Sequence, residues 1–246
     1  MSSESKIEWT EQTWNPTTGC DKVSPGCKHC YAEVMAKRLC AMGAGGYAAG
    51  FALTLHPKRL EQPLRRKKPT VYFVNSMSDL FHEEIPDHFI DQVLDVISRT
   101  PQHTYQILTK RAERLPHYFS SRRCPPNVWL GVTVENRAYG LPRIDALRKV
   151  AVSVRFVSVE PLLEDLGPVD FSGIQWVIVG GESGPKARPM KAEWAENVRR
   201  SAKVAGAAYF FKQWGTWGAD GVKRAKQLNG RKLNGETYDE YPMYAS

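Results

Sequence analysis

The sequence of 246 residues has no long hydrophobic run and only five cysteines. Its longest apolar segments, such as WVIVGG, are far shorter than the roughly 20 residues that a transmembrane helix needs. The start, MSSESKIEWTEQTWNP, lacks the basic residues and apolar stretch of a secretory signal. We therefore expect a cytoplasmic protein with no membrane partner, whose cysteines are reduced thiols or metal ligands rather than disulfides.

Acidic residues are also in the minority. Lys and Arg number 34 against 26 Asp and Glu, which gives a formal net charge of +8. A basic surface favours a polyanionic partner, nucleic acid first, but it also simply keeps a protein soluble. The charge alone therefore leaves both interpretations open.

Short apolar runs typical of strands recur at intervals that suit βα units. They are VYFVN (71–75), TYQILT (104–109), VWLGVTV (128–134), VRFVSV (154–159), WVIVGG (176–181) and AYFFK (208–212). Helical patterns lie between them, in PDHFIDQVLDVISR, RIDALRKV and AEWAENVRRSAKVAG. This alternation predicts an α/β protein with either a doubly wound sheet or a (β/α) barrel.

Polar residues lie at, or directly after, the C-terminal ends of all six predicted strands. They include Ser76, Ser78 and Asp79, then Lys110, Thr133 with Glu135 and Asn136, Glu160, Glu182, and Lys212. A doubly wound sheet would concentrate such groups at one switch point, whereas a barrel with one active-site mouth distributes them over its strands. We therefore expect a single domain over residues 1–246 built as a full or partial (β/α) barrel.

Two segments lie outside the alternation. Residues 56–69, HPKRLEQPLRRKKP, contain prolines that disfavour a long helix, and we expect an exposed basic loop. Its basic residues are Lys58, Arg59, Arg65, Arg66, Lys67 and Lys68. The C-terminal part, about residues 215–246, holds two Asn-Gly pairs and predicts a small hairpin appendage.

Three cysteines, Cys20, Cys27 and Cys30, share one short segment with the spacing C-x6-C-x2-C. A zinc site would need a fourth ligand, and no second cysteine pair follows. Cys40 lies about 15 Å beyond Cys30 if the intervening segment is helical, and we expect a core thiol there. Three thiolate ligands without a fourth suit a [4Fe–4S] cluster, in which one iron has no protein ligand and stays open to a small molecule.

The cysteine loop is preceded by KIEWT (6–10), which we expect to be a short N-terminal strand, and is followed by a helix and a (β/α) series. This arrangement resembles the radical S-adenosylmethionine enzymes, and the resemblance implies a full or partial (β/α)6-type barrel. More narrowly, the motifs WNPTTGC, VSPGCKHCYAE, LFHEEIP, ILTKR, GVTVEN, FVSVEPLL, VIVGGESG, FFKQWG and TYDEYP resemble a radical-SAM-like family common in phages and bacteria. The likeness covers nearly the whole chain. One departure is the first cysteine gap, which is six residues here and usually three.

The resemblance implies a role for each motif. Cys20, Cys27 and Cys30 would hold the N-terminal cluster, and His29 would pack against the adenine of S-adenosylmethionine. Ser76, Ser78 and Asp79 occupy the place of a glycine-rich motif that binds the methionine amino group, although that motif is not literally present. Thr133, Glu135 and Asn136 would face the ribose, and Gly180 and Gly181 would approach the adenine, or simply form a tight turn.

The implied chemistry is reductive cleavage of S-adenosylmethionine, which gives a 5′-deoxyadenosyl radical. Lys110, Glu160, Glu182 and Lys212 are candidate catalytic residues at the mouth, or members of structural ion pairs. With the basic loop and an electron donor for the cluster, the leading hypothesis is a radical enzyme that modifies or repairs a nucleic-acid base. The alternatives are a radical enzyme on a peptide or small metabolite, and a non-catalytic zinc or iron–sulfur protein that binds nucleic acid.

Overall fold

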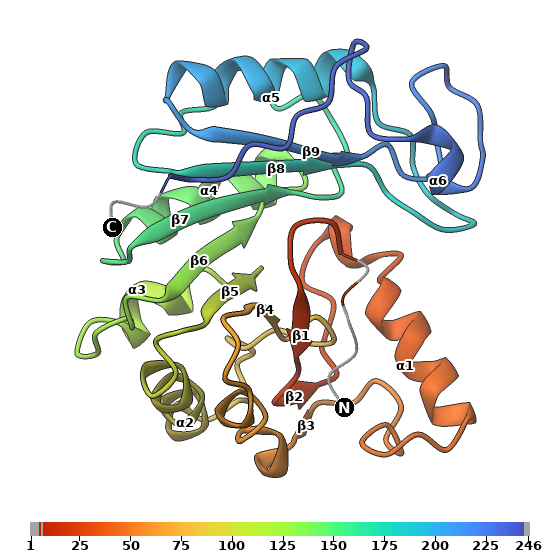
Figure 1. The fold of residues 1–246 in the computed structure, drawn as a ribbon. Helices are drawn as coiled ribbons and strands as arrows, with labels where there is room; N and C mark the ends of the chain where they lie inside the picture. The colour runs from red at the N-terminus through yellow and green to blue at the C-terminus, as the bar shows by residue number, and fades with distance from the viewer. Residues whose placement is uncertain (1–4, 6, 244–246) are drawn as a thin grey trace. The chain divides into compact units, whose positions relative to one another are not determined.

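The structure is a computed structural model that describes residue 5 and residues 7–243. Seven strands form one sheet in the order β1-β4-β5-β6-β7-β8-β9, with helices between most of them (Figure 1). The strands are β1 Gln12–Trp14, β4 Val71–Val74, β5 Thr104–Thr109, β6 Val128–Thr133, β7 Val154–Val159, β8 Trp176–Gly180 and β9 Ala208–Gln213. Strand pairs β1–β4, β4–β5, β7–β8 and β8–β9 are parallel. This order confirms the predicted fold class, an α/β chain of the partial (β/α)-barrel type.

The chain divides into two compact units. Unit 1 comprises Met1–Val23, Cys30–Gly131 and Lys149–Ser153, and unit 2 comprises Ser24–His29, Val132–Arg148 and Val154–Ser246. The chain passes between them more than once, and one of these passages, Gly131 to Val132, lies within β6. Whether the whole of 1–246 acts as one domain stays a prediction, and its outermost residues lie outside those described.

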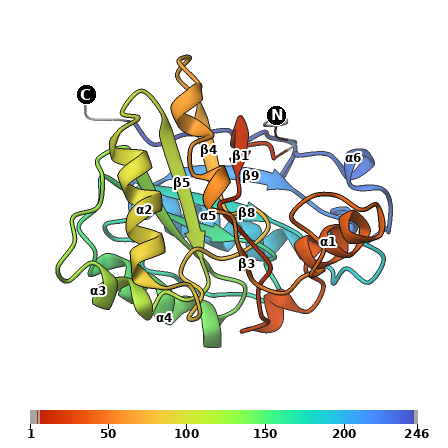
Figure 2. The same ribbon diagram turned by 90° about the horizontal axis from the view of Figure 1, so that it is seen from below.

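Unit 1 contains β1, β4 and β5 with the helices α1 Tyr31–Ala41, α2 Asp87–Ser98 and α3 Arg114–Tyr118. The periodicity of α2 predicts its buried face correctly, since Phe89, Ile90, Val93 and Ile97 are all at most 2% exposed. The helix lies alongside β5 (Figure 2). Pro86 precedes it as the N-cap residue, where its fixed φ does not interrupt the helical hydrogen bonds.

The first strand differs from the sequence prediction. KIEWT (6–10) resembles a strand, but the described residues 7–10 form a turn in which Thr10 N–H donates to the Ile7 carbonyl at 3.3 Å. Strand β1 begins two residues later, at Gln12. It pairs with β4 in parallel, and its alternating side chains bury Gln12 and Trp14. The sequence prediction did not include this strand.

The remaining elements of unit 1 are short. A two-stranded antiparallel sheet joins β2 Thr17–Thr18 to β3 Thr54–Leu55. The basic segment forms two 3-10 turns, η2 Pro57–Arg59 and η3 Pro63–Arg65, each with proline in its first turn. A third turn, η1 Pro25–Cys27, belongs to unit 2. The prolines thus exclude a long helix, as expected.

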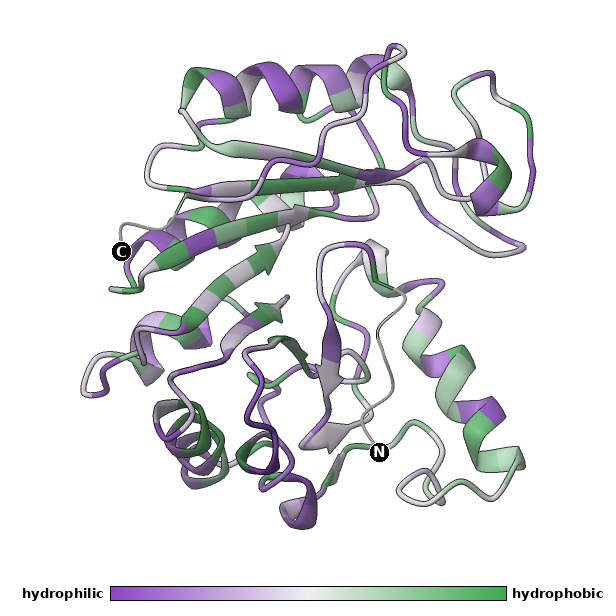
Figure 3. Ribbon diagram, in the orientation of Figure 1, coloured by the Kyte–Doolittle hydropathy of each residue, from purple (hydrophilic) through white to green (hydrophobic). Residues whose placement is uncertain are grey.

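Unit 2 contains β7, β8 and β9 with α4 Arg137–Arg148, α5 Ala192–Val204 and α6 Lys226–Asn229. Strand β8 is buried at every position, and Figure 3 colours most of it as hydrophobic. Helix α5 packs on β8 and β9 through small residues, among them Ala195 and Ala202. Helix α4 begins six residues before the predicted RIDALRKV and continues through Pro142.

The C-terminal segment contains one of the two predicted Asn-Gly turns. Leu233 and Glu236 exchange both backbone hydrogen bonds, at 2.9 and 3.0 Å, around Asn234 and Gly235, which both have positive φ. The other pair instead ends α6, with Gly230 at φ 68°. Residues after the turn pair with β9, since Asp239 forms an antiparallel bridge to Phe210. Within the described residues, no helix combines the length and the apolarity required to span a bilayer.

Candidate functional site

The cysteine segment lies between β2 and α1. All five cysteines of the chain belong to the residues that the structure describes, and none of the five forms a disulfide. Cys20 is held near the C-terminal end of β4, because Gly19 N–H donates to the Met77 carbonyl at 3.0 Å and Gly19 pairs with Ser78. Gly19 has φ 85°, and a Cβ there would lie 2.1 Å from the Ala52 carbonyl oxygen, so only glycine fits.

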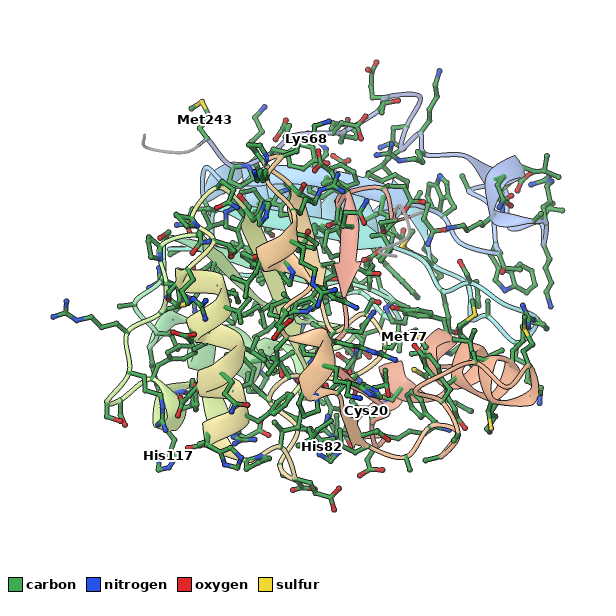
Figure 4. The ribbon with its side chains drawn as sticks, turned by 60° about the horizontal axis from the view of Figure 1, so that its bottom comes forward. Cys20, Lys68, Met77, His82, His117 and Met243 are labelled. Carbon is green, nitrogen blue, oxygen red and sulfur yellow. The ribbon has the colours of Figure 1, made fainter. Side chains whose placement is uncertain are left out.

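Cys30 is the N-cap residue of α1. Its thiol therefore lies at the helix end whose dipole stabilises a thiolate. Cys20 and Cys30 belong to unit 1, and Figure 4 shows Cys20 at the same end of that unit as Met77 and His82. Unit 1 thus places two of the three predicted cluster ligands, one beside a strand end and one at a helix N-terminus.

Arg111 contacts Cys20. Its side chain is buried, with Nη1 3.3 Å from Cys20 Sγ, and Nη2 donates to the Asp21 carbonyl at 3.5 Å. Burial by itself would lower the pKa of Arg111, but the charges of Asp79 and Cys20 raise it above its ordinary value. The guanidinium is therefore a fixed positive charge beside the first cysteine.

Asp79 organises the ends of β4 and β5. Its Oδ1 accepts hydrogen bonds from the Thr109 hydroxyl at 2.8 Å and the Phe81 N–H at 3.0 Å. Its Oδ2 accepts from the Lys110 N–H at 2.9 Å and lies 3.6 Å from Arg111 Nη1. The carboxylate predicted to bind the methionine group thus has four protein partners, and Lys110 lies half-buried next to it.

The two predicted serines contact the N-terminal strands of unit 1. The Ser78 hydroxyl donates to the Thr17 carbonyl at 2.9 Å, and the Ser76 hydroxyl donates to Asn15 Oδ1 at 3.2 Å. The Tyr31 hydroxyl, at the start of α1, donates to the Ser76 carbonyl. Both serine side chains therefore connect the loop after β4 to its neighbours.

His82 lies beside Asp21 and Glu84, and ligand atoms of the three lie within 4.8 Å of one another. The ring is fully buried, and its Nδ1 accepts from the Glu84 N–H at 3.2 Å. Nε2 must then carry the proton, and it donates to Asp21 Oδ2 at 3.2 Å. Both ring nitrogens of His82 thus have hydrogen-bond partners within unit 1.

Unit 2 holds the middle of the cysteine segment, Ser24–His29. Arg188 Nη2 donates to the Pro25 carbonyl at 3.0 Å and lies 2.5 Å from Glu182 Oε1, while Nε lies 2.8 Å from Oε2. A Cβ on Gly26 would lie 3.1 Å from Cγ of Glu135. Cys27 therefore follows a backbone turn that two strand-end carboxylates, Glu135 and Glu182, help to fix.

The same two carboxylates are charge-paired. Burial would raise the pKa of Glu182, but hydrogen bonds from Arg188 bring it below its ordinary value. Glu135 is fully buried and lies 2.6 Å from Arg143 Nη1, which also donates to the Thr133 carbonyl at 2.7 Å. The structural ion pair foreseen as one interpretation of Glu182 is present, and Glu135 has one as well.

The remaining predicted residues of unit 2 have defined positions. Asn136 Oδ1 accepts the Tyr139 N–H at 3.0 Å in the first turn of α4. His29 is half-buried, and its charge contributes to the lowered pKa of Glu182. The Thr133 hydroxyl is buried and has no hydrogen-bond partner among the described residues.

Glu160 and Lys212 form an ion pair at the ends of β7 and β9. Lys212 Nζ lies 3.3 Å from both carboxylate oxygens, and each side chain is partly exposed, at 15% and 19%. A Cβ on Gly180 would lie 2.3 Å from Glu160 Oε1, and one on Gly181 would lie 1.9 Å from the Trp214 carbonyl oxygen. These glycines therefore make room for a side chain and a strand end of the protein itself.

Comparison with known proteins places the chain in a family. A family model described as "Protein of unknown function (DUF5131)" matches residues 4–242. The chain belongs to the DUF5131 family. No curated protein matches it.

Solved structures of spore photoproduct lyase share the fold of the DUF5131 chain. Two mutant structures match with TM-scores of 0.55 and 0.54, both at 14% identity, over 85% of this chain and 78% of theirs. A third, complexed with dinucleoside spore photoproduct, matches with a TM-score of 0.50 at 13% identity, over 82% and 64%. The DUF5131 chain spans only 58% of two further structures of that lyase. At these identities the likeness shows the fold.

The predicted basic loop of the DUF5131 chain is only partly available to a partner. Three of its six cations contact their surroundings: Arg59 with the Asn15 carbonyl, Arg65 with Glu61, and Arg66 with the Thr70 hydroxyl. Lys58, Lys67 and Lys68 are exposed, and so is Arg65, whose partner Glu61 also lies on the surface. Lys68 lies at the opposite end of unit 1 from Cys20 (Figure 4). Lys68 precedes the first residue of β4, whereas Cys20 is held near the C-terminal end of that strand.

Sequence reasoning missed the arginines of the site. Arg111, Arg143 and Arg188 each pair with a predicted strand-end carboxylate. Arg111 was within reach, because it lies two residues after β5, in the motif ILTKR that also contains Lys110. Arg143 and Arg188 lie eight and six residues beyond their partners, in segments without a local signal.

Proposed function

We propose that this chain is an enzyme of the radical S-adenosylmethionine superfamily that acts on a base in nucleic acid. Cys20, Cys27 and Cys30 would hold a [4Fe–4S] cluster. The observation that carries the proposal is the cysteine segment, anchored beside the C-terminal end of β4 in a chain whose motifs resemble the radical SAM enzymes and whose fold is that of spore photoproduct lyase.

The residues around the cysteines fit such a group. The guanidinium of Arg111, whose Nη1 lies 3.3 Å from Cys20 Sγ, would offset the negative charge of a Cys20 thiolate bound to the cluster. The helix N-terminus does the same at Cys30. Gly19 lets the backbone turn closely before the first ligand. When bound, the cluster supplies the electron for reductive cleavage of S-adenosylmethionine.

The protein's own contribution is to bind and orient the substrate and to move protons. Lys110 and the Glu160–Lys212 pair are the candidates, because they are polar, partly exposed and located at the carboxyl ends of strands. Lys212 would hold an anionic or carbonyl group, and Glu160 would accept a proton or hydroxyl hydrogen bond. Asp79, Glu135 and Glu182 have arginine partners and would instead support the site.

A nucleic-acid substrate agrees with two further observations. One structure of similar fold has a dinucleoside photoproduct as its ligand, and this chain has a net charge of +8. Chemistry on a base in a duplex would require the base to leave the stack. The exposed Lys58, Lys67 and Lys68 would contribute phosphate contacts at a distance from Cys20 rather than at the cysteine loop.

Anaerobic purification tests the cluster. We expect a brown protein with about four iron atoms and four sulfides per chain, and loss of the iron in C27A. Cys40→Ala is the matched control, because Cys40 lies in α1 with its Sγ 3.7 Å from the Ala48 carbonyl, and it should keep its iron. A colourless protein with stoichiometric zinc would refute the cluster and favour a zinc-binding module.

The activity has its own test. With dithionite and S-adenosylmethionine, the wild-type protein should form 5′-deoxyadenosine, and C27A should not. Ultraviolet-irradiated oligonucleotides, undamaged DNA and RNA are then compared as co-substrates. Faster turnover with one nucleic acid supports the proposal, whereas a holoprotein that forms no 5′-deoxyadenosine with any of them contradicts it.

A further inference from the structure

Arg111 contacts a proposed cluster ligand directly. Its Nη1 lies 3.3 Å from Cys20 Sγ, and the arginine is only 5% exposed. A buried guanidinium keeps its charge at all physiological pH values, and a hydrogen bond with an ionised partner is roughly twice as strong as a neutral one. The contact is thus a fixed donor and a fixed charge at one sulfur.

The arginine is held in place by its own unit. Its backbone N–H donates to the Thr109 hydroxyl at 2.9 Å, and Thr109 in turn donates to Asp79. Asp79 Oδ2 lies 3.6 Å from Nη1, and Nη2 donates to the Asp21 carbonyl. These contacts fix both ends of the side chain, so the guanidinium does not need Cys20 to keep its position.

We propose that Arg111 is a positioning residue that orients Cys20 and raises the reduction potential of the cluster bound there. The inference rests on the proposed function. Reduction adds one negative charge to the cluster, and hydrogen bonds to its sulfurs and nearby charge set its potential. A donor with a positive charge stabilises the reduced form more than the oxidised form, which favours uptake of the electron.

Redox titration of the holoprotein, followed by electron paramagnetic resonance, tests the inference. Arg111→Gln keeps a hydrogen-bond donor but loses the charge. We expect the equilibrium constant for one-electron reduction of the cluster to fall at least tenfold, which corresponds to a reduction potential lower by about 59 mV. Arg111→Lys keeps the charge on a shorter side chain and should shift less, in the same direction. Asp79→Asn removes the opposing carboxylate charge and should shift the potential upward.

Arg99→Gln is the matched control, because it makes the same chemical change at an exposed arginine whose partner is Asp95 in α2. Its potential should equal that of the wild type. Thermal unfolding of the apoproteins checks that every variant is folded, and if Arg111→Gln loses its iron, Arg111→Lys and Asp79→Asn carry the comparison.

The outcomes separate the two proposals. Wild-type protein that takes up no iron–sulfur cluster overturns the proposed function and this inference with it. Wild-type protein with a cluster whose potential is the same in Arg111→Gln, Arg111→Lys and Asp79→Asn overturns the inference alone. Shifts of opposite sign at Arg111 and Asp79 support it, since general loosening of the site would move both in one direction.

Discussion

Removing the carboxylate of Asp79 should destabilise unit 1 strongly, even in the apoprotein. Asp79 is 7% exposed and accepts hydrogen bonds from the Phe81 N–H, the Lys110 N–H and the Thr109 hydroxyl. Asp79→Ala leaves these donors without an acceptor and leaves Arg111 without its carboxylate. The prediction therefore depends only on contacts within this unit.

The magnitude follows from the number of donors. A buried donor left without an acceptor costs about 1–3 kcal/mol, and two of these donors are backbone groups that cannot rotate away. With the lost charge partner of Arg111, we expect about 3–5 kcal/mol for Asp79→Ala. For a chain of this size about 1 kcal/mol corresponds to 2–4 °C in Tm, so the transition should fall by about 6–20 °C.

Differential scanning calorimetry and urea unfolding of the apoprotein at pH 7.5 measure the effect. Asp79→Asn keeps one oxygen that can accept from Thr109 and Phe81, and it should lose about 1–2 kcal/mol, mainly at the Lys110 N–H. Asp95→Ala removes an exposed ion pair with Arg99 and should cost less than about 1 kcal/mol. If Asp79→Ala were no more destabilising than Asp95→Ala, the reasoning about buried donors would be wrong.

Three further predictions concern single side chains. Arg188→Met frees the Pro25 carbonyl, so the anaerobically purified variant should hold less iron than wild type at equal protein concentration. Gly181→Ala forces a Cβ to 1.9 Å from the Trp214 carbonyl oxygen, and we expect loss of soluble protein, whereas Gly45→Ala, with no atom within 4 Å of its Cβ, should remain soluble. Burial raises the pKa of Cys124 to about 12, so at pH 8 iodoacetamide should label it only after denaturation, as mass spectrometry of native and unfolded samples would show.

The fold was predictable to the extent that strands and helices have local patterns. Runs 104–109 and 154–159 match β5 and β7 at both ends, because continuous apolar residues bounded by polar ones mark a buried parallel strand. Strand β1 was misplaced since three residues carry too short a pattern to distinguish it from KIEWT nearby. Its identity depends on pairing with β4, which is a long-range contact.

The site was predictable at one level and not at the next. Polar residues at strand ends identify where functional groups gather, and Asp79, Glu160 and Lys212 do lie at such ends. Their partners do not follow from the same rule. Glu160 pairs with a lysine 52 residues away, and Asp79 with an arginine 32 residues away, so only the folded chain shows which charges are balanced.

Both units use a buried acid to orient an arginine toward the cysteine segment. In unit 1, Asp79 lies beside Arg111, whose guanidinium reaches Cys20 Sγ. In unit 2, Glu182 holds Arg188, whose guanidinium reaches the Pro25 carbonyl. Arginine suits this position because its planar group can bind a carboxylate on one side and donate to a second acceptor on another.

This arrangement has a consequence for pH. Because Arg188 lowers the pKa of Glu182 from its ordinary value of 4.5, the stabilisation by this pair is complete above that value and is lost as the pH falls through the lower folded-state pKa. The hydrogen bond from Arg188 to the Pro25 carbonyl should weaken over the same pH range, because a protonated Glu182 no longer fixes the guanidinium. The free energy of unfolding of the apoprotein, measured with urea between about pH 7 and pH 3, should therefore start to fall at a higher pH in Arg188→Lys, which lacks the second donor, than in the wild type. Equal acid sensitivity of the two proteins would show that the acid and its arginine do not support the cysteine segment together.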